Sequence, residues 1–387
     1  MYTNTHIHTP YSFSAFDSID EAVRCARDEK IDVLGISDFN TLDGFQEFSL
    51  ICEKYLVYPL YNIEFIAFSP DDKKENQRWN DPKNPGIIYF CGKALNYPTI
   101  LSADSRNLLG SLWKGTQDHI WKVIHLVNEV LAKRGLDFTI DYNQIRTGYA
   151  KNTVRERHVA KALYISIVRK WITPEERLVR FRRMFDAQAY YADCSNSALM
   201  QNEIRNQLLK AGKPAFVEEK PEAFLSLPVL KGLIIEAGGI PCYPVLADEK
   251  SGLTEYERDV VKLADRLQDL GIHAVEFIPL RNGFDHLKNY VRHFRDRGFC
   301  ITFGTEHNTP DRIPMVPSAR GGHPFDEELL QVAYEGACIL AAHQEQRRQN
   351  HTGFIDETGA RVHTPNQLRD FIRIGDDAIK RVAGVKN

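Results

Sequence analysis

Apolar runs alternate with amphipathic segments over the first 65 residues of the chain. Ser18 and Glu21 have the spacing of a capping box at the start of the first helical segment. Strands that alternate with helices favour a parallel sheet or barrel, whose functional groups gather at the carboxyl ends of the strands. The pattern predicts strands and helices in this order: strand 2–8, helix 19–26, strand 32–37, helix 43–55 and strand 56–65.

The pattern changes after a polar loop at 69–86 and a further apolar strand at 87–91. From about residue 102 to residue 230, long helical patterns dominate, for example at 118–135 and 202–212. Strand-like runs then resume at 239–243, 274–277 and 300–304, and helices joined by a polar connection near 350–361 follow from 326 onward.

This organisation predicts an α/β barrel that a mainly helical segment interrupts. We expect the barrel to be built from residues 1–100 and 230–325, with a helical insertion subdomain at 101–229. The C-terminal helices, 326–387, are expected to pack on the barrel.

Composition narrows the class of protein. The chain has 387 residues, of which 43% are hydrophobic and 26% charged, so it can fold around a large core without disulfides or structural metals. Its 49 Lys and Arg against 52 Asp and Glu give a net charge of −3, which argues against a nucleic-acid partner.

Further sequence features bear on where the protein works. No apolar run is long enough to predict a membrane span, and the N-terminus has no pattern of a signal peptide. The seven scattered cysteines form no CxxC motif and fit reduced thiols. We therefore expect a cytoplasmic protein with no membrane association.

The motif THIHT at 5–9 is the sharpest local signal for chemistry. On a strand, residues two apart point to the same side, so His6 and His8 would present two imidazoles together. Neutral imidazole is the commonest metal ligand in proteins. Paired histidines also occur by chance on surfaces and in cores, so the motif alone does not establish a metal site.

Three carboxylates at strand ends strengthen the metal interpretation. Asp38, Glu64 and Glu306 each follow an apolar strand pattern, where a parallel sheet collects functional groups. Taken singly, Asp38 could cap the next helix and the two glutamates could be solvated loop residues. Their coincidence with the paired histidines favours one metal site.

Several motifs, in their order, resemble the PHP (polymerase and histidinol phosphatase) superfamily and most of all its metal-dependent phosphoesterase branch. The resemblance covers nearly the whole chain, and it implies a distorted (β/α)7 barrel that holds three divalent metals for phosphoester hydrolysis. The motifs are THIHT, DFNT (38–41), IEF (63–65), RHVA (157–160) within the predicted insertion, AGGIPCYP (237–244) and FGTEHNT (303–309).

The resemblance also implies a reduced set of metal ligands. The first metal site of the family maps onto four residues that can all ligate: His6, His8, Glu64 and Glu306. The positions that correspond to ligands of the second and third sites are occupied by Tyr89, Tyr243, Phe13, Phe39 and Asn308. Phenylalanine cannot ligate a metal, so the resemblance implies one divalent ion per chain, with Zn, Mn or Fe suited to two histidines and two carboxylates.

Other residues are candidates for catalysis or substrate binding. Asp38 would ligate or orient the ligands, and His307 would enter the site only if the backbone turns at that point. Arg157 and His158 begin a helical pattern in the insertion, where Arg157 would grip a phosphate or simply form part of a solvated helix face. Tyr243, Asn308 and Glu276 are weaker candidates for the pocket wall.

We therefore predict a metal-dependent hydrolase that acts as a phosphoesterase on a small phosphorylated molecule, with Glu64, Asp38 and His307 in catalytic roles. One metal lowers the pKa of bound water and polarises a phosphoryl oxygen. The alternatives are a PHP-derived binding or regulatory protein that has lost catalysis, and a single-metal enzyme with lyase or amidohydrolase chemistry.

Overall fold

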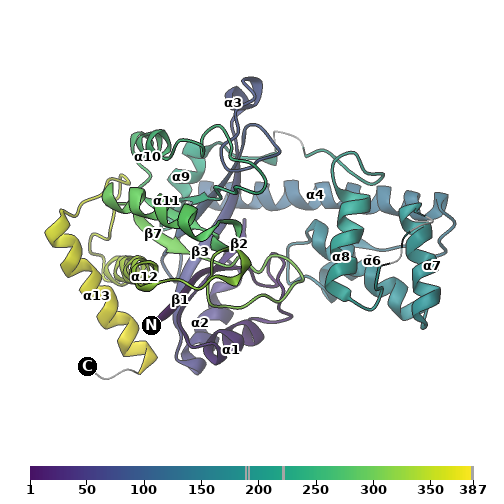
Figure 1. The fold of residues 1–387 in the computed structure, drawn as a ribbon, viewed down its shortest axis with the longest axis horizontal. Coiled ribbons are helices and arrows are strands. Elements are labelled where there is room, and N and C mark those ends of the chain that lie inside the picture. Colours follow the sequence, from purple (N-terminus) through teal and green to yellow (C-terminus); the bar gives the residue numbers. More distant parts are fainter. Residues whose placement is uncertain (188–189, 191, 220–222, 385–387) are drawn as a thin grey trace.

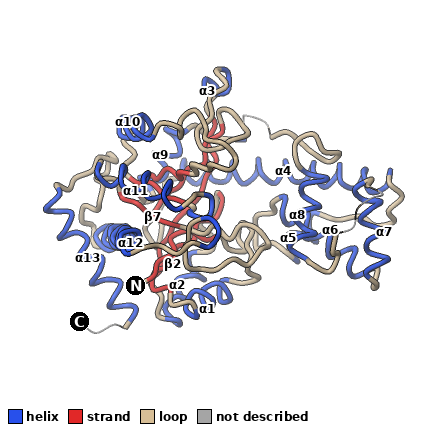
Figure 2. Tube along the Cα trace, viewed as in Figure 1, coloured by secondary structure: helices blue, strands red, loops and turns tan. Residues whose placement is uncertain are grey.

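A computed structural model gives the fold of residues 1–387; it describes all of them except 188–189, 191, 220–222 and 385–387. Seven strands form one sheet in chain order, and the sheet curves into a nearly closed barrel (Figures 1 and 2). A parallel bridge between Ile7 and Glu306 joins the first and last strands near their ends. The strands are β1 (Tyr2–Ile7), β2 (Ile31–Phe39), β3 (Tyr58–Phe68), β4 (Ile87–Lys93), β5 (Ile240–Val245), β6 (Ala274–Phe277) and β7 (Cys300–Phe303).

The predicted barrel is therefore present, with one departure from a parallel sheet. β4 runs antiparallel to both β3 and β5, whereas the other neighbouring strands pair in parallel. The polar segment 69–86 separates β3 from β4 and contains the short helix α3 (Pro70–Lys74). Parallel neighbours are usually joined by a crossover helix that packs on the sheet, and this connection contains only the five-residue α3.

Helices cover the outer surface of the barrel. α1 (Ile19–Asp28) starts as the sequence predicts, because the side chain of Ser18 accepts a hydrogen bond from the backbone N–H of Glu21. The other helices next to the strands are α2 (Phe45–Tyr55), α9 (Leu227–Glu236), α10 (Val260–Asp269) and α11 (Phe284–Asp296).

The chain between β4 and β5 is mainly helical and lies largely beside the barrel (Figures 1 and 2). Its buried side chains, drawn from residues 120–215, form a hydrophobic cluster separate from that of the barrel. The helices are α4 (Ala103–Lys133), α5 (Tyr142–Gly148), α6 (Glu156–Lys170), α7 (Pro174–Phe185), α8 (Ser197–Ile204) and the π-helical turn η1 (Arg205–Leu209).

Two C-terminal helices, α12 (Glu327–Arg348) and α13 (Pro365–Ala383), pack on each other and on the strands. α12 approaches β7 closely at Gly336, where a Cβ atom would lie 1.8 Å from the carbonyl oxygen of Ile301. Alanines of α12 pack against the starts of several strands in a third buried cluster. None of the helices in the described part of the chain is long and apolar enough to cross a membrane.

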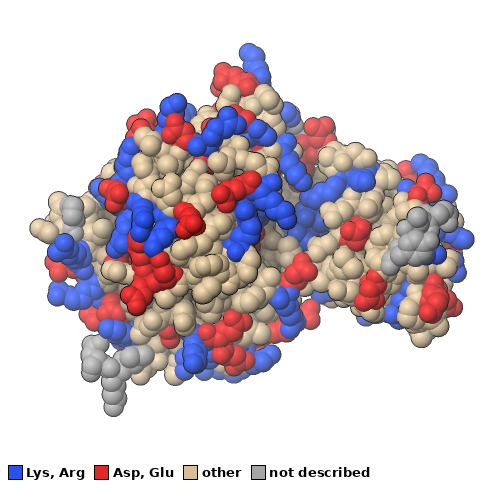
Figure 3. All heavy atoms as spheres, in the orientation of Figure 1, with Lys and Arg blue, Asp and Glu red and all other residues tan. Residues whose placement is uncertain are grey.

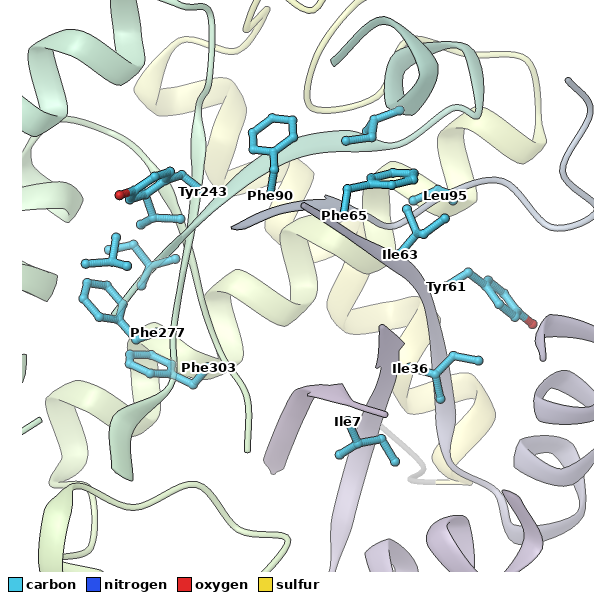
Figure 4. Packing of buried hydrophobic residues seen from close by; sticks show 14 of the residues in the cluster. Ile7, Ile36, Tyr61, Ile63, Phe65, Phe90, Leu95, Tyr243, Phe277 and Phe303 are labelled. Carbon is cyan, nitrogen blue, oxygen red and sulfur yellow. The ribbon is translucent and has the colours of Figure 1, made fainter. Parts of the chain in front are cut away.

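The packing of the core determines which strand side chains face the barrel interior. Ile63 and Phe65 of β3 belong to the cluster that lies beneath the outer helices (Figure 4). Because side chains alternate along a strand, Asn62 and Glu64 point to the opposite side, into the barrel. Polar and charged groups therefore occupy the interior of the barrel.

Candidate metal centre

Two imidazoles and one carboxylate converge inside the barrel. His6 at the end of β1, His8 just beyond it and Glu64 on β3 are all buried. The Oε2 atom of Glu64 lies 3.0 Å from Nε2 of His8 and 3.6 Å from Nε2 of His6. One potential ligand atom from each residue lies within 4.8 Å of the others, and we call these three residues the primary set.

Hydrogen bonds hold His8 with its Nε2 atom toward Glu64. The Nδ1 atom of His8 lies 3.0 Å from the hydroxyl of Ser12, which donates to Asp38 over 2.6 Å. Asp38 also accepts hydrogen bonds from the backbone N–H and the hydroxyl of Thr9. Since the Ser12 proton goes to Asp38, the hydroxyl oxygen accepts from His8 Nδ1, which leaves Nε2 free to ligate. The carboxylate of Asp38 thus acts through Ser12 as a positioning group.

A buried carboxylate orients His6 in the same way. Nδ1 of His6 donates to Oε2 of Glu276 on β6 over 2.6 Å. The other oxygen of Glu276 accepts from the ammonium group of Lys93 over 2.6 Å and from the hydroxyl of Thr5 over 3.0 Å. Carboxylates that bind the second nitrogen of a histidine commonly fix its orientation in metal sites.

The backbone of β1 is irregular where it supplies these histidines. Between Asn4 and Ile7 the register with β2 shifts, and the carbonyl of Thr5 accepts a hydrogen bond from the side chain of Asn62. Gly35 of β2 makes room for this bulge, since a Cβ atom there would lie 2.5 Å from the Thr5 carbonyl oxygen. Gly304 similarly leaves space for the side chain of His6.

The charges of the primary set depend on its neighbours. Burial opposes a charge on His6, but the carboxylates of Glu276 and Glu64 raise the pKa of its imidazole to about 9. Burial likewise opposes ionisation of Glu64, but the neighbouring imidazoles of His6 and His8 lower the pKa of its carboxyl to about 2. The metal-free centre is therefore an ionised carboxylate beside a protonated histidine.

The donor set fits a divalent metal ion. Oε2 of Glu64 is buried and accepts no hydrogen bond, although both imidazoles lie close to it. A buried carboxylate oxygen of this kind requires a positive charge beside it, and a divalent ion would supply that charge in place of the protonated His6. Two Nε2 atoms and one carboxylate oxygen form a ligand combination known for catalytic zinc and non-haem iron sites, which leave further positions open.

The fourth expected ligand lies outside the primary set. The side chain of Glu306 pairs with Arg281, whose guanidinium Nη2 atom is 3.2 Å from Oε2 of Glu306. The chain turns sharply here, with φ values of +61° at Glu306 and +48° at His307. This turn and the ion pair with Arg281 explain why the carboxylate does not join His6 and His8.

The structure does not bring His307 to the primary set either. Its Nδ1 atom lies 2.7 Å from the hydroxyl of Thr305, its Nε2 atom lies 3.0 Å from the carbonyl of Ile313, and its ring stacks on Phe16. Burial lowers the pKa of His307 to about 4. The backbone turns as the alternative hypothesis required, but both ring nitrogens have other partners. Asn308 follows in the same loop and is half-buried.

Phe39 and Phe13 connect the centre to the helical segment between β4 and β5. Phe39 stacks on His8 with ring centroids 4.9 Å apart, and the guanidinium of Arg155 lies 4.5 Å from the Phe39 ring centroid. The guanidinium of Arg157 lies 5.8 Å from the Phe13 ring centroid. At these two positions the family resemblance implied metal ligands. Here each position holds a phenylalanine whose ring contacts an arginine guanidinium.

Arg157 is a half-buried cation with an unusual environment. Its guanidinium donates to the side-chain oxygen of Asn202 over 3.1 Å, and no ion pair with a carboxylate is formed within the described residues. Burial and the positive charge of Arg205 lower the pKa of Arg157 to about 9. Burial and Arg205 also lower the pKa of Lys210. Such a group of cations favours an anionic ligand.

Three tyrosine and histidine candidates have different surroundings. His158 is buried, and its Nδ1 atom accepts a hydrogen bond from the backbone of Arg155, so it caps α6. The hydroxyl of Tyr243 lies 3.4 Å from Glu257, among the residues under the outer helices, and therefore away from the primary set. Tyr89 points to the same side of β4 as Cys91, which pairs with Glu64 across the sheet. Burial and the nearby charges of Asp81 and Glu64 raise the pKa of its hydroxyl.

Space for a ligand exists where the barrel meets the helical segment. A cavity of about 510 Å³ lies beside the end of β2 and is lined by Asn40, Leu101, Trp113 and Asn152, among others. A smaller cavity of about 180 Å³ is lined by Phe13, His158 and Lys161, among others. Lys and Arg side chains gather around the hollow between the barrel and this segment (Figure 3).

The comparisons with known proteins agree with this geometry. Residues 4–173 match the family model of the PHP domain. This part of the chain is similar to the PHP domain. The match includes the primary set, Asp38 and the start of the helical segment with Arg157, and it confirms the resemblance that the sequence motifs indicated.

Two solved structures share the fold of this chain. One is a candidate metal-dependent phosphoesterase from Bifidobacterium adolescentis, with 15% identity, a TM-score of 0.54, and coverage of 85% of this chain and 93% of that one. The other is an amidohydrolase from Chromobacterium violaceum with bound sulfate and no metal, with 14% identity, a TM-score of 0.51, and coverage of 86% and 96%. At this identity they show the fold alone. None of the curated proteins matches the sequence.

Sequence reasoning missed several residues that complete the centre. Lys93 and Arg281 carry charges next to Glu276 and Glu306, and Ser12 links His8 to Asp38. The signal for Lys93 was a lysine at the end of an apolar strand, where its charge must find a partner inside the protein. Glu276 was expected only in the pocket wall, yet it is the direct partner of His6.

Proposed function

We propose that this PHP-domain protein is a hydrolase that uses one divalent metal ion to cleave a phosphoester in a small molecule. His6, His8 and Glu64 would hold the ion. The observation that carries the proposal is the convergence of two Nε2 atoms on a buried carboxylate oxygen that accepts no hydrogen bond. A bound divalent ion supplies a lowered pKa for coordinated water and polarises a phosphoryl oxygen.

The chain's own residues would prepare the site for this chemistry. Glu276 would orient His6 directly, and Asp38 would orient His8 through Ser12. Both imidazoles would then keep Nε2 toward the metal position. Phe39 covers one face of His8 and limits access of water from that side. Removing water from around charged groups strengthens their electrostatic interactions, so a single cation exerts a stronger field on the substrate.

Arg157 would bind the phosphate group. It is half-buried, positively charged and without a carboxylate partner among the described residues, and a guanidinium can donate two parallel hydrogen bonds to phosphate oxygens. Its guanidinium lies 5.8 Å from the ring centroid of Phe13, in the loop that follows His8. We propose a phosphorylated small molecule as the substrate, rather than a nucleic acid or a membrane.

We expect a phosphoesterase with a narrow substrate range and a low turnover rate. Sites with several metals stabilise both the attacking and the leaving oxygen, and a single ion cannot do both. Arg157 and the hydroxyl of Tyr89 would replace part of this stabilisation through fixed charge and hydrogen bonding. Generic aryl phosphates should therefore turn over slowly, and clear hydrolysis should need a fitting substrate.

The test is a metal-reconstituted assay across phosphomonoesters, phosphodiesters and nucleotides with Zn²⁺, Mn²⁺ and Fe²⁺, with Glu64→Gln as the matched inactive variant. Slow, selective hydrolysis that Glu64→Gln abolishes would support the proposal. Fast and unselective hydrolysis would show that the missing ligands matter little. The absence of hydrolysis with every metal would refute the proposal.

A binding or regulatory protein without catalysis is the second candidate. The ion pair between Glu306 and Arg281 favours it, because it withdraws the fourth expected ligand from the primary set. Tight binding of a small phosphorylated molecule, measured by calorimetry, together with no hydrolysis under any metal, would support this candidate.

A further inference from the structure

A second group of potential metal ligands lies beside the first inside the barrel. His6, Cys91 and Glu276 are all buried, and one potential ligand atom from each lies within 4.8 Å of the others. We call these residues the interior set. It shares His6 with the primary set, so the two sets would compete for the orientation and charge of one imidazole.

A buried ammonium group forms an ion pair with Glu276 of the interior set. Lys93 is fully buried, and its Nζ atom lies 2.6 Å from Oε1 of Glu276. The same ammonium donates to the carbonyl of Thr5 over 3.3 Å and to the hydroxyl of Ser37 over 3.4 Å. All three contacts lie in the barrel interior, so the ammonium is fixed by groups on β1, β2 and β6.

The charge of Lys93 bears on metal binding at this position. A divalent cation on Glu276 would lie next to the ammonium and be repelled by it, in surroundings that screen charge poorly. It would also have to displace the hydrogen bond from His6 that orients this imidazole toward the primary set. Lys93 already supplies the positive charge that the buried carboxylate needs.

We propose that Lys93 selects the metal position: its ammonium group occupies Glu276, excludes metal from the interior set, and so directs one ion to His6, His8 and Glu64. This inference rests on the metal binding stated in the proposed function, and goes beyond it by assigning the choice between two donor sets to one residue. Lys93 is a positioning residue here, since it acts on the metal through Glu276 and His6.

The two sets differ in a way that spectroscopy detects. The interior set contains a thiol, and the primary set contains none. A cobalt ion bound by Cys91 would show the intense near-ultraviolet absorption of a thiolate–cobalt bond, whereas a cobalt ion on the primary set would not. Cobalt therefore reports which set is occupied, without any measurement of activity.

The test compares the full-length protein with Lys93→Met in titrations with Co²⁺, followed by absorption and by equilibrium dialysis. We expect the wild-type protein to bind Co²⁺ without thiolate absorption, and Lys93→Met to gain that absorption. The double variant Lys93→Met/Cys91→Ser should lose it again. Lys133→Met, which removes an exposed lysine of α4, is the matched control and should resemble wild type.

Lys93→Met leaves Glu276 with His6 as its remaining cationic partner, and the weaker charge balance can unfold the variant when no metal is present. In that case excess Co²⁺ should restore the fold together with the thiolate absorption. The double variant Lys93→Met/Glu276→Gln removes both charges, and should fold without metal and show no thiolate absorption.

Three results would overturn the inference. The first is thiolate absorption in the wild-type protein, and the second is a folded Lys93→Met variant without thiolate absorption. The third is a Lys93→Met variant that Co²⁺ cannot refold, although Lys93→Met/Glu276→Gln is folded. These results are separate from a failure of the proposed function, which would appear as wild-type protein that binds metal on the primary set but hydrolyses no phosphoester.

Discussion

Nδ1 of His6 donates a hydrogen bond to Glu276 over 2.6 Å inside the barrel. This bond leaves the Nε2 atom of His6 directed toward Glu64. The ion pair of Glu276 with Lys93 balances the charge of the carboxylate, so that it can remain ionised although it is fully buried. Lys93 and His6 lower the pKa of Glu276 to about 2 against the effect of burial.

Glu276→Gln should weaken metal binding about 10- to 100-fold, since it removes the acceptor that orients His6 and raises its basicity. The measurement is competition with a chromophoric chelator. Because the single variant also leaves Lys93 without a counter-ion, Glu276→Gln/Lys93→Met serves as the control for the unpaired charge. Equal metal affinity in wild type and both variants would show that Glu276 has no orienting role.

The pH dependence of stability should differ between metal-free and metal-loaded protein. His6 has a pKa of about 9 in the folded metal-free protein, against 6.5 when unperturbed. Its contribution to stability is therefore fully present below pH 6.5 and is lost as the pH rises through 9. Bound metal requires a neutral imidazole, so its stabilisation should instead grow as the pH rises over this range.

Urea unfolding at pH 6, 7.5 and 9, with chelator and with metal, measures both trends. His6→Asn should flatten the pH dependence of the metal-free protein. A wild-type protein whose metal-free stability rises between pH 6.5 and 9 would contradict the assigned charge of His6.

Arg157→Gln should raise the KM for a phosphorylated substrate about tenfold or more, because a hydrogen bond to a charged group is lost. Inhibition by inorganic phosphate should weaken in parallel. Arg373→Gln, which neutralises an exposed arginine of α13, is the matched control. An unchanged KM with a lowered kcat would place Arg157 in a different role from phosphate binding.

Gly304→Ala should reduce metal affinity, because the added Cβ would lie 2.2 Å from the Cβ of His6 and displace that side chain. Gly110→Ala is the control, since Gly110 lies in α4 with no atom within 4 Å of an added Cβ. We expect Gly110→Ala to be neutral or to stabilise the protein by up to about 1 kcal/mol. Thermal unfolding and chelator competition on both variants check this, and equal metal affinity in both would contradict the crowding at His6.

The sequence allowed prediction of most strands because each is a short apolar run with clear boundaries. The run 274–277, for example, is the whole of β6. The antiparallel direction of β4 escaped prediction, because an apolar run carries no information about the direction of pairing. The boundaries of the helical insertion, near residues 100 and 230, stay a prediction.

The sequence predicts the candidate site well where the ligands lie on one short segment. It predicts the site poorly where contacting residues are far apart in the sequence. His6 and His8 follow from alternation along β1 and the residue just beyond it, and Glu64 follows from its place in β3. The ion pair of Glu306 with Arg281 joins residues 25 positions apart, and no local pattern signals it. Lys93 and Glu276 lie 183 positions apart, so their pairing needs the three-dimensional structure.

Elemental analysis of metal-reconstituted protein tests the central claim most directly. We expect one tightly bound divalent ion per chain in the wild-type protein, and none in Glu64→Gln or in His6→Ala/His8→Ala. Two or three equivalents in the wild-type protein, or tight binding that survives in His6→Ala/His8→Ala, would contradict it.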